Sequence, residues 1–203
     1  MKRRIAFFGG TFDPVHTGHL AMAEAAASAL NLHRVYFVPA SRNPLKGDGP
    51  LAPAFDRLEM LRLAIAGHHR FNIWEGELGR PGPSYTLHSV EHIEQVYPNC
   101  HLFWIIGSDQ LAKLPQWFGI DRLVNKIGFI LVRRPGYPLE WPGVPGLRLY
   151  PVTNPQHDVS ASLIRSLRQA GRDLSGLVPA GVETYIRRCR LYEKEGLGAG
   201  EEA

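Results

Sequence analysis

Two histidines stand three residues apart near the start of the chain, in the stretch GGTFDPVHTGHL. His16 and His19 follow a short apolar run, and an alanine-rich segment with helical spacing begins at residue 19. A helix that begins here places both imidazoles on the same side, beside backbone N–H groups that have no partner within the helix. Such a helix N-terminus binds anions, and two imidazoles beside it suit a phosphate that gains charge during reaction.

The glycines that precede the histidines, Gly9 and Gly10, end the apolar run. They permit a sharp bend and the close approach of a ligand to the backbone. Two other interpretations of the histidines stay open. Histidines at positions i and i+3 can ligate zinc, but no third ligand stands at a motif spacing, so we predict no protein-bound metal. Alternatively, one histidine ends the turn and the other packs in the core.

A second candidate anion site lies near the C-terminus, in the segment VSASLIRSL. Ser160 and Ser162 stand at the start of a predicted helix, and Arg165 follows about one turn later. Exposed N–H groups, hydroxyls and a guanidinium together form a cradle for phosphates. The same residues are also compatible with ordinary helix capping and a surface arginine.

The elements that must position these residues alternate between strand and helix. Apolar runs predict strands, and segments with helical spacing predict the helices between them. The predicted strands are 4–9, 34–40, 71–78, 101–107, 126–134 and 147–152, and the predicted helices are 19–32, 54–67, 84–97 (capped by Ser84), 160–171 and 182–196. This alternation predicts an α/β fold, a Rossmann-like parallel sheet with helices on both faces and ligands at the carboxyl ends of the strands.

The composition bounds the class of protein. We interpret residues 1–196 as a single domain and expect 197–203 to form a disordered tail. The formal net charge is +4, but no block rich in lysine and arginine stands out. We therefore expect no nucleic-acid partner, and an RNA-binding module is the weaker alternative. The two cysteines, Cys100 and Cys189, are too few for a disulfide framework, and we expect both to be buried free thiols.

The chain also lacks the signals of export and membrane insertion. No apolar run reaches the length of about 18 residues that a membrane span needs. Glycines break the apolar run behind the basic N-terminus, so it does not read as a signal peptide. We expect a cytoplasmic protein without a membrane partner, and a homo-oligomer is compatible with the sequence.

GGTFDPVHTGHL resembles the H-x-G-H signature of the nucleotidyltransferase superfamily, which includes mononucleotide adenylyltransferases, phosphopantetheine adenylyltransferase, cytidylyltransferases and class I aminoacyl-tRNA synthetases. The resemblance implies that an attacking oxygen displaces pyrophosphate from the α-phosphorus of a nucleoside triphosphate, without a covalent enzyme intermediate. His16 and His19 would hold the triphosphate and stabilise the charged transition state. Gly10, Thr11 and Phe12 would lie beside the ATP.

The segment VSASLIR is similar to the I-S-S-T-x-I-R signature of the same superfamily. The resemblance implies that Ser160, Ser162 and Arg165 contact ATP. Val159 stands where the signature has isoleucine, and Ala161 replaces its second serine. Any hydroxyl contact from that position is therefore absent in this chain.

Two further segments resemble bacterial nicotinate mononucleotide adenylyltransferases. ELGRPGPSYTLHSV resembles their R-x-G-P-S-Y-T segment, in which the backbone of Tyr85 and Thr86 would receive the nicotinate carboxylate. IIGSDQLAKLPQW resembles their I-I-G-x-D-x-L…L-x-x-W segment. Gly107 would permit close approach of the ATP nucleoside, Asp109 would accept its ribose hydroxyls, and Trp117 would stack on the pyridine ring.

The loops of the same family supply the remaining predicted contacts of the mononucleotide. NPLKG resembles the family's N-P-P-H-K loop, so Lys46 matches its lysine, while Leu45 stands where its histidine would be. RRPG matches a family R-P-G segment, with Arg134 as a phosphate contact. The resemblance also places Gly9 beside the mononucleotide. It runs from residue 5 to about 192, and we assign Arg57, in the helix after the lysine loop, a structural role.

The resemblance implies an adenylyltransferase that joins ATP to nicotinate mononucleotide and releases deamido-NAD and pyrophosphate, in NAD biosynthesis. Mg²⁺ would arrive with ATP, held mainly by the triphosphate and water. The alternatives are another adenylyltransferase, such as the phosphopantetheine enzyme, and a nucleotide-binding protein without activity. Nicotinamide mononucleotide is an alternative substrate, but a neutral amide gains less from a helix N-terminus than a carboxylate does.

Overall fold

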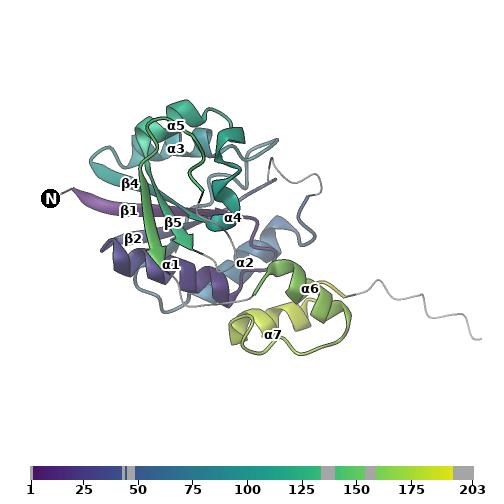
Figure 1. Ribbon diagram of the computed structural model, residues 1–203. Helices are drawn as coiled ribbons and strands as arrows, with labels where there is room; N and C mark the ends of the chain where they lie inside the picture. The colour runs from purple at the N-terminus through teal and green to yellow at the C-terminus, as the bar shows by residue number, and fades with distance from the viewer. Residues whose placement is uncertain (1, 43, 45–48, 134–139, 154–158, 194–203) are drawn as a thin grey trace, which may run out of the picture.

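The computed structural model describes residues 2–42, 44, 49–133, 140–153 and 159–193, so the expected tail at 197–203 lies outside the described residues. Six parallel strands form one sheet in the order β3-β2-β1-β4-β5-β6 (Figure 1). The strands are β1 (Arg3–Gly10), β2 (Arg34–Pro39), β3 (Phe71–Ile73), β4 (Cys100–Gly107), β5 (Gly128–Arg133) and β6 (Leu149–Thr153). The predicted α/β fold with a parallel sheet is confirmed.

The strand order changes direction between β1 and β4. The chain builds outward from β1 through β2 to β3, and then returns to place β4 on the other side of β1. At such a switch point the connections leave the two strand ends in opposite directions and open a crevice at their carboxyl ends. The turn after Gly10 and the turn after Gly107 both border this crevice.

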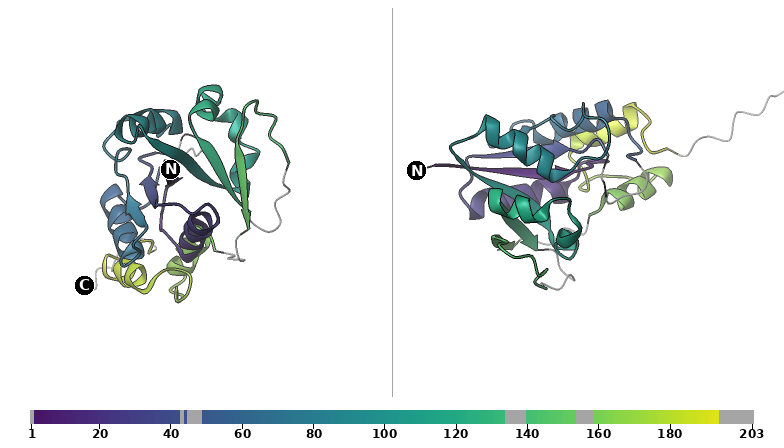
Figure 2. Two further views of the ribbon diagram at one scale, coloured as in Figure 1. Left: turned by 90° about the vertical axis from the view of Figure 1, so that its left-hand side faces the viewer. Right: turned by 90° about the horizontal axis from the view of Figure 1, so that it is seen from above.

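Helices cover both faces of the sheet, as Figure 2 shows from two directions. The helices are α1 (Thr17–Ala29), α2 (Ala54–Ile65), α3 (Thr86–Val96), α4 (Ser108–Leu111), the 3-10 helix η1 (Leu114–Gln116), α5 (Ile120–Lys126), α6 (Ala161–Gln169) and α7 (Ala180–Arg188). Among the described residues, every helix is too short or too polar to span a bilayer.

Alternating side chains of the strands feed two separate cores. Phe8 of β1 belongs to the core that includes residues of α1, α2, α6 and α7. Its neighbour Phe7 belongs to the core that includes residues of α3, α4, η1 and α5. The same alternation holds in β5, where Ile130 and Leu131 point to opposite faces. Both side chains are fully buried, as expected for parallel strands that carry helices on both sides.

A buried arginine joins the carboxyl ends of β1 and β2. Arg57 of α2 is 1% exposed, and its Nη1 donates to the carbonyl oxygens of Thr11 (2.7 Å) and Ala40 (2.8 Å). Burial lowers the pKa of its guanidinium from the usual value, and the charge of Asp13 opposes that shift. Arg57 therefore fixes the two loops that leave these strands, which fits the structural role we assigned to it.

Sequence reasoning missed the helices between β4 and β5. Residues 108–125, to which we assigned no element, contain α4, η1 and all of α5 except its last residue, Lys126. All three are short, and Pro115 and Gly119 interrupt the segment, so no continuous helical spacing signals them. The helix after β3 also begins later than predicted: its N-cap is Tyr85, and Ser84 makes other contacts.

Other predicted boundaries also need correction. β3 ends at Ile73 although we predicted a strand to residue 78, because residues 75–80 form turns closed by backbone hydrogen bonds. The last helix ends at Arg188, short of the predicted residue 196. The expectation of two buried thiols is wrong, since Cys100 is half-buried and Cys189 is exposed.

The difference in burial between two leucines of α2 predicts that their replacement by alanine lowers the free energy of unfolding by different amounts. Leu61 is fully buried, whereas Leu63 on the same helix is 40% exposed. Leu61→Ala should lower the free energy of unfolding by about 2–5 kcal/mol because it leaves a cavity. Leu63→Ala should change it by less than about 1 kcal/mol. Urea denaturation measures both, and equal losses would contradict this assignment of the core.

Candidate active site

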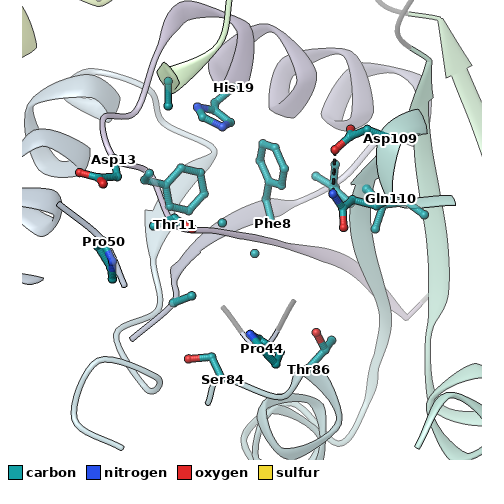
Figure 3. A pocket seen from close by; sticks show the side chains of 18 of the residues that line it. Phe8, Thr11, Asp13, His19, Pro44, Pro50, Ser84, Thr86, Asp109 and Gln110 are labelled. Atoms are coloured by element: carbon teal, nitrogen blue, oxygen red, sulfur yellow. Dashed lines mark hydrogen bonds between the residues drawn. The ribbon is translucent and has the colours of Figure 1, made fainter. Parts of the chain in front are cut away.

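A cavity of about 1050 Å³ lies at the carboxyl ends of β1 and β4 (Figure 3). Every predicted site residue that the structure describes lines it. These residues are Gly9, Gly10, Thr11, Phe12, His16, His19, Tyr85, Thr86, Gly107, Asp109, Trp117, Ser160, Ser162 and Arg165. Lys46 and Arg134, together with Leu45, lie outside the described residues. Segments that are up to about 150 residues apart therefore meet in one place.

The two histidines stack at the start of α1. His16 is the N-cap residue and is 2% exposed, and its ring lies 3.6 Å from that of His19 at an interplanar angle of 27°. The backbone N–H of His16 donates to Nδ1 of His19 at 3.2 Å. Because Nδ1 accepts this bond, a neutral His19 ring carries its proton on Nε2. The pair thus places an imidazole donor beside the N-terminus of α1.

Aromatic rings fix the orientation of His19. The rings of Phe8 and Phe12 lie edge-on to it, with centroids 5.8 and 5.0 Å away. Phe12 has a left-handed backbone conformation, with φ of 50°. The same ring explains why position 10 is a glycine, because a Cβ at Gly10 would lie 2.9 Å from the Phe12 ring. A Cβ at Gly9 would lie 2.6 Å from the Trp104 ring, so both glycines have a packing reason besides ligand approach.

The carboxylate of Asp13 holds the turn between β1 and α1. Oδ1 accepts from Ala52 N (3.1 Å) and from the Tyr192 hydroxyl (2.7 Å), and Oδ2 accepts from Leu51 N (2.8 Å). Nη1 of Arg165 donates to the Asp13 carbonyl at 2.7 Å. Three distant segments therefore converge on one residue. Sequence reasoning gave Asp13 and Tyr192 no role, because only the fold brings them together.

The serines at the start of α6 are already hydrogen-bonded within the protein. Ser160 is the N-cap, and its hydroxyl oxygen accepts from Leu163 N at 3.1 Å. Ser162 Oγ accepts from Nη2 of Arg165 at 3.3 Å. The predicted capping role is therefore confirmed for Ser160. The bonds to Ser162 and to the Asp13 carbonyl hold the guanidinium of Arg165 at the rim of the cavity, next to the turn that carries the histidines.

The opposite wall of the cavity is built by the start of α3 and the segment after β4. Figure 3 shows Thr86 and Ser84 across the cavity from His19, with Asp109 to one side. Nε2 of Gln110 donates to Oδ2 of Asp109 at 2.7 Å and orients that carboxylate. The N–H of Tyr85 donates to the Pro83 carbonyl at 3.1 Å. In this conformation the first turn of α3 therefore offers the N–H of Thr86 rather than that of Tyr85.

Aromatic side chains complete this wall. Trp117 is half-buried and meets Phe129 edge-on, with ring centroids 6.1 Å apart. Among the described residues, its indole Nε1 is buried and has no hydrogen-bond partner. Phe118, which sequence reasoning missed, packs on Tyr85 with ring centroids 4.8 Å apart. A flat ligand that enters here meets aromatic faces.

A buried carboxyl group also reaches this wall. Glu77 is 4% exposed and accepts a hydrogen bond from the Ser89 hydroxyl. Burial raises the pKa of the Glu77 carboxyl, and hydrogen bonds from Ser89 and Ser84 and the charge of Arg80 oppose that shift without cancelling it. Glu77 lay inside a quoted motif, but no spacing or pairing in the sequence singled it out.

The sequence matches the cytidylyltransferase-like family over residues 7–167. It is 42% identical over 192 residues to the "Probable nicotinate-nucleotide adenylyltransferase" of Geobacillus thermodenitrificans, a match that covers 93% of this chain and 86% of the relative. It is 39% identical over 194 residues to the "Nicotinate-nucleotide adenylyltransferase" of Bacillus subtilis, covering 94% of this chain and 99% of that protein.

Solved structures share the fold. Plasmodium falciparum nicotinic acid mononucleotide adenylyltransferase complexed with NaAD superposes with a TM-score of 0.77 at 19% identity, over 94% of this chain and 97% of that one. A putative nicotinate-nucleotide adenylyltransferase from Vibrio parahaemolyticus gives a TM-score of 0.70 at 18% identity, over 95% and 96%. At this level of identity the likeness establishes the architecture of the sheet and helices.

The contact between Tyr192 and Asp13 predicts a cost for removing one hydroxyl. Tyr192→Phe takes a donor from a carboxylate, so the free energy of unfolding should fall by about 1–3 kcal/mol. Tyr150→Phe is the matched control, because Tyr150 is 37% exposed on β6. Urea denaturation compares the two variants, and an equal change would show that the hydroxyl does not hold the turn.

The raised pKa of Glu77 predicts a pH dependence of stability. The folded protein holds this proton more tightly than the unfolded chain, so this contribution to stability is lost as pH rises above about 4.3 through the folded-state pKa. Glu77→Gln removes the titration. The free energy of unfolding of wild type minus that of the variant should therefore fall as pH rises above about 4. A difference that rises with pH would contradict the burial argument.

Proposed function

We propose that this chain, which belongs to the nicotinate-nucleotide adenylyltransferase family, transfers the AMP group of ATP to nicotinate mononucleotide and releases deamido-NAD and pyrophosphate. A single cavity carries this proposal. Its walls hold the stacked histidines of α1, Arg165 of α6 and the first turn of α3. These are donors for the phosphates of one substrate and for the carboxylate of the other.

ATP would lie along the wall built by α1 and α6. His16 and His19 would contact the triphosphate, with Nε2 of His19 as the donor, and Arg165 would neutralise the outer phosphates. Arg165 already donates to Ser162 and to the Asp13 carbonyl, so its guanidinium is held in place before ATP binds. Gly10, Thr11 and Phe12 would border the nucleotide, as would the hydroxyl of Ser160.

The ATP nucleoside would lie beside the end of β4. Gly107 is the last residue of that strand, and Asp109 stands in the first turn of α4. The bond from Gln110 orients the Asp109 carboxylate, whose remaining lone pairs would accept the ribose hydroxyls. Both residues line the same cavity as the histidines. The α-phosphate would therefore lie between the histidines on one side and Gly107 and Asp109 on the other.

Nicotinate mononucleotide would occupy the opposite wall. Its carboxylate would accept from the backbone at Thr86, where the first turn of α3 leaves N–H groups unpaired. Trp117 would stack on the pyridine ring. Gly9 would border the mononucleotide, and we propose Lys46 and Arg134 as contacts of its phosphate.

The reaction then needs positioning and charge neutralisation. An oxygen of the mononucleotide phosphate attacks the α-phosphorus in line, the new phosphoanhydride bond forms, and the bond to pyrophosphate breaks with its electron pair. Mg²⁺ enters with ATP, as part of that substrate. Among the described residues, no group of three or more ligating side chains is placed to hold a metal ion.

Release of pyrophosphate tests the proposed function directly. The purified protein is incubated with ATP and Mg²⁺, and nicotinate mononucleotide, nicotinamide mononucleotide or phosphopantetheine is added in parallel. We expect release with the nicotinate nucleotide and little with the other two. Equal release with the amide would contradict the carboxylate site, and release with phosphopantetheine alone would overturn the assignment of substrate.

His19→Ala should lower kcat by a factor of about 100 or more, because it removes a donor that stabilises developing charge. The variant should stay folded, although it loses the acceptor of the buried His16 N–H and so about 1–3 kcal/mol of the free energy of unfolding. His33→Ala is the matched control, since His33 is exposed just before β2, at the opposite end of the sheet. A His19 variant with near-normal turnover would remove this residue from the catalytic machinery.

Trp117→Ala should weaken binding of nicotinate mononucleotide about tenfold and leave the KM for ATP nearly unchanged, because only the pyridine ring would stack on the indole. Trp141→Ala serves as the control, since Trp141 is 62% exposed and does not line the cavity. Steady-state kinetics with each substrate varied in turn measures both effects. Equal losses for the two substrates would argue against stacking.

A further inference from the structure

We infer that Glu77 is a positioning residue for the mononucleotide site. It fixes the turn before α3 relative to Ser41 and Arg42, the residues that precede the lysine loop. This inference rests on the proposed function and extends it to a residue outside the predicted site residues. Glu77 lies in the turns after β3. Its carboxylate is linked through two serines to both segments that the mononucleotide would meet.

The first link runs into α3. The Ser89 hydroxyl donates to Oε1 of Glu77, and both side chains are buried. Ser89 stands one turn into the helix whose first residue, Thr86, lines the cavity. This contact therefore fixes the axial position of α3 relative to the turn that carries Glu77.

The second link runs through Ser84 to the residues before the lysine loop. The Ser84 hydroxyl is close enough to the Glu77 carboxyl to lower its pKa, and its oxygen accepts from Ser41 N at 3.0 Å. A hydroxyl can donate one bond and accept others, so both contacts can exist together. The N–H of Ser84 donates to the Arg42 carbonyl at 2.8 Å. We predicted that Ser84 caps α3, but it instead hydrogen-bonds Ser41 and Arg42, which precede the loop that contains Lys46.

The cost of burying the Glu77 carboxyl group indicates that this group positions other segments and does not serve mainly to stabilise the fold. Burying an ionisable group is costly, and none of the ion pairs found between described residues includes Glu77. The charge of Arg80 lowers the pKa of the Glu77 carboxyl, but the Arg80 guanidinium lies over the Trp74 ring. An apolar side chain would fill the space without this penalty, but it could not accept bonds from two serines.

The position of the relay predicts which substrate is affected. The relay ends at Ser41, Ser84 and Ser89, all on the side of the cavity that would bind the mononucleotide. The histidines and Arg165 lie on other elements, and Figure 3 shows His19 across the cavity from Ser84. Loss of Glu77 should therefore loosen the mononucleotide site and leave the ATP site largely in place.

Steady-state kinetics on a small set of variants tests the inference. Glu77→Ala should raise the KM for nicotinate mononucleotide about tenfold, and the KM for ATP less than about twofold. Glu77→Gln keeps an acceptor oxygen and should recover most of the loss. Glu75→Ala is the matched control, because Glu75 is exposed two residues earlier and pairs only with Arg62 among the described ion pairs.

A double-mutant cycle tests the relay itself. If Glu77 acts through Ser84, then Ser84→Ala should raise the same KM, and the double variant should lose little more than either single variant. Hydrogen exchange adds a readout that needs no substrate. The Ser41 amide, which donates to Ser84, should exchange faster in Glu77→Ala than in Glu75→Ala.

The outcomes separate this inference from the proposed function. If wild type shows no turnover with nicotinate mononucleotide, the proposed function fails, and hydrogen exchange alone decides whether the relay exists. If wild type is active but Glu77→Ala behaves like Glu75→Ala in both assays, the inference is overturned. Equal increases of both KM values would also overturn it, since a general loss of structure would then explain the effect. Glu77→Gln and Ser84→Ala carry the test if Glu77→Ala does not fold.

Discussion

The arrangement of the active site depends on the hydrogen bonds that the Asp13 carboxylate accepts. This carboxylate accepts from two backbone amides and one hydroxyl, and it lies three residues before His16. A buried carboxylate with three donors has little freedom to move, because breaking any of these bonds leaves a charge poorly solvated. The turn that presents the histidines is thus fixed by contacts from outside its own segment.

Arg57 and Arg165 complete this arrangement through the backbone carbonyls of the same turn. One guanidinium is buried beneath the turn, and the other lies at the rim of the cavity. Their charges also bear on the substrates, since both ATP and nicotinate mononucleotide are anionic. A site that holds two anions side by side must supply positive charge from several directions. Under the proposed function, the helix N-termini, the guanidinium of Arg165 and the imidazole donors would supply it.

The local parts of this arrangement were predictable from the sequence. The spacing of His16 and His19 predicted a pair at a helix start, and the alternation of apolar runs predicted a parallel sheet. The strand ends then indicated where the ligands would lie, and each described residue of the predicted site lines the cavity. These inferences succeed because a helix start and a parallel strand leave signals within a few residues.

The contacts between distant segments could not be predicted in the same way. Asp13 and Tyr192 are separated by 179 positions, and neither type of residue signals the other. Ser84 precedes a helix in a sequence that suits an N-cap, but Ser41 competes for its hydroxyl in the folded chain. Short helices such as α4 and α5 form because their apolar residues meet the sheet, and that tertiary contact leaves no periodic signal in the chain.

The central claim is that both substrates share one cavity, so that AMP passes directly from ATP to the mononucleotide. The stereochemistry at the α-phosphorus tests it most directly. An ATP analogue with a chiral α-thiophosphate is converted to product, and the configuration at phosphorus is compared before and after transfer. A single in-line displacement inverts the configuration, and inversion is the predicted result. Retention would require two displacements through a covalent intermediate on the protein, and it would contradict direct transfer.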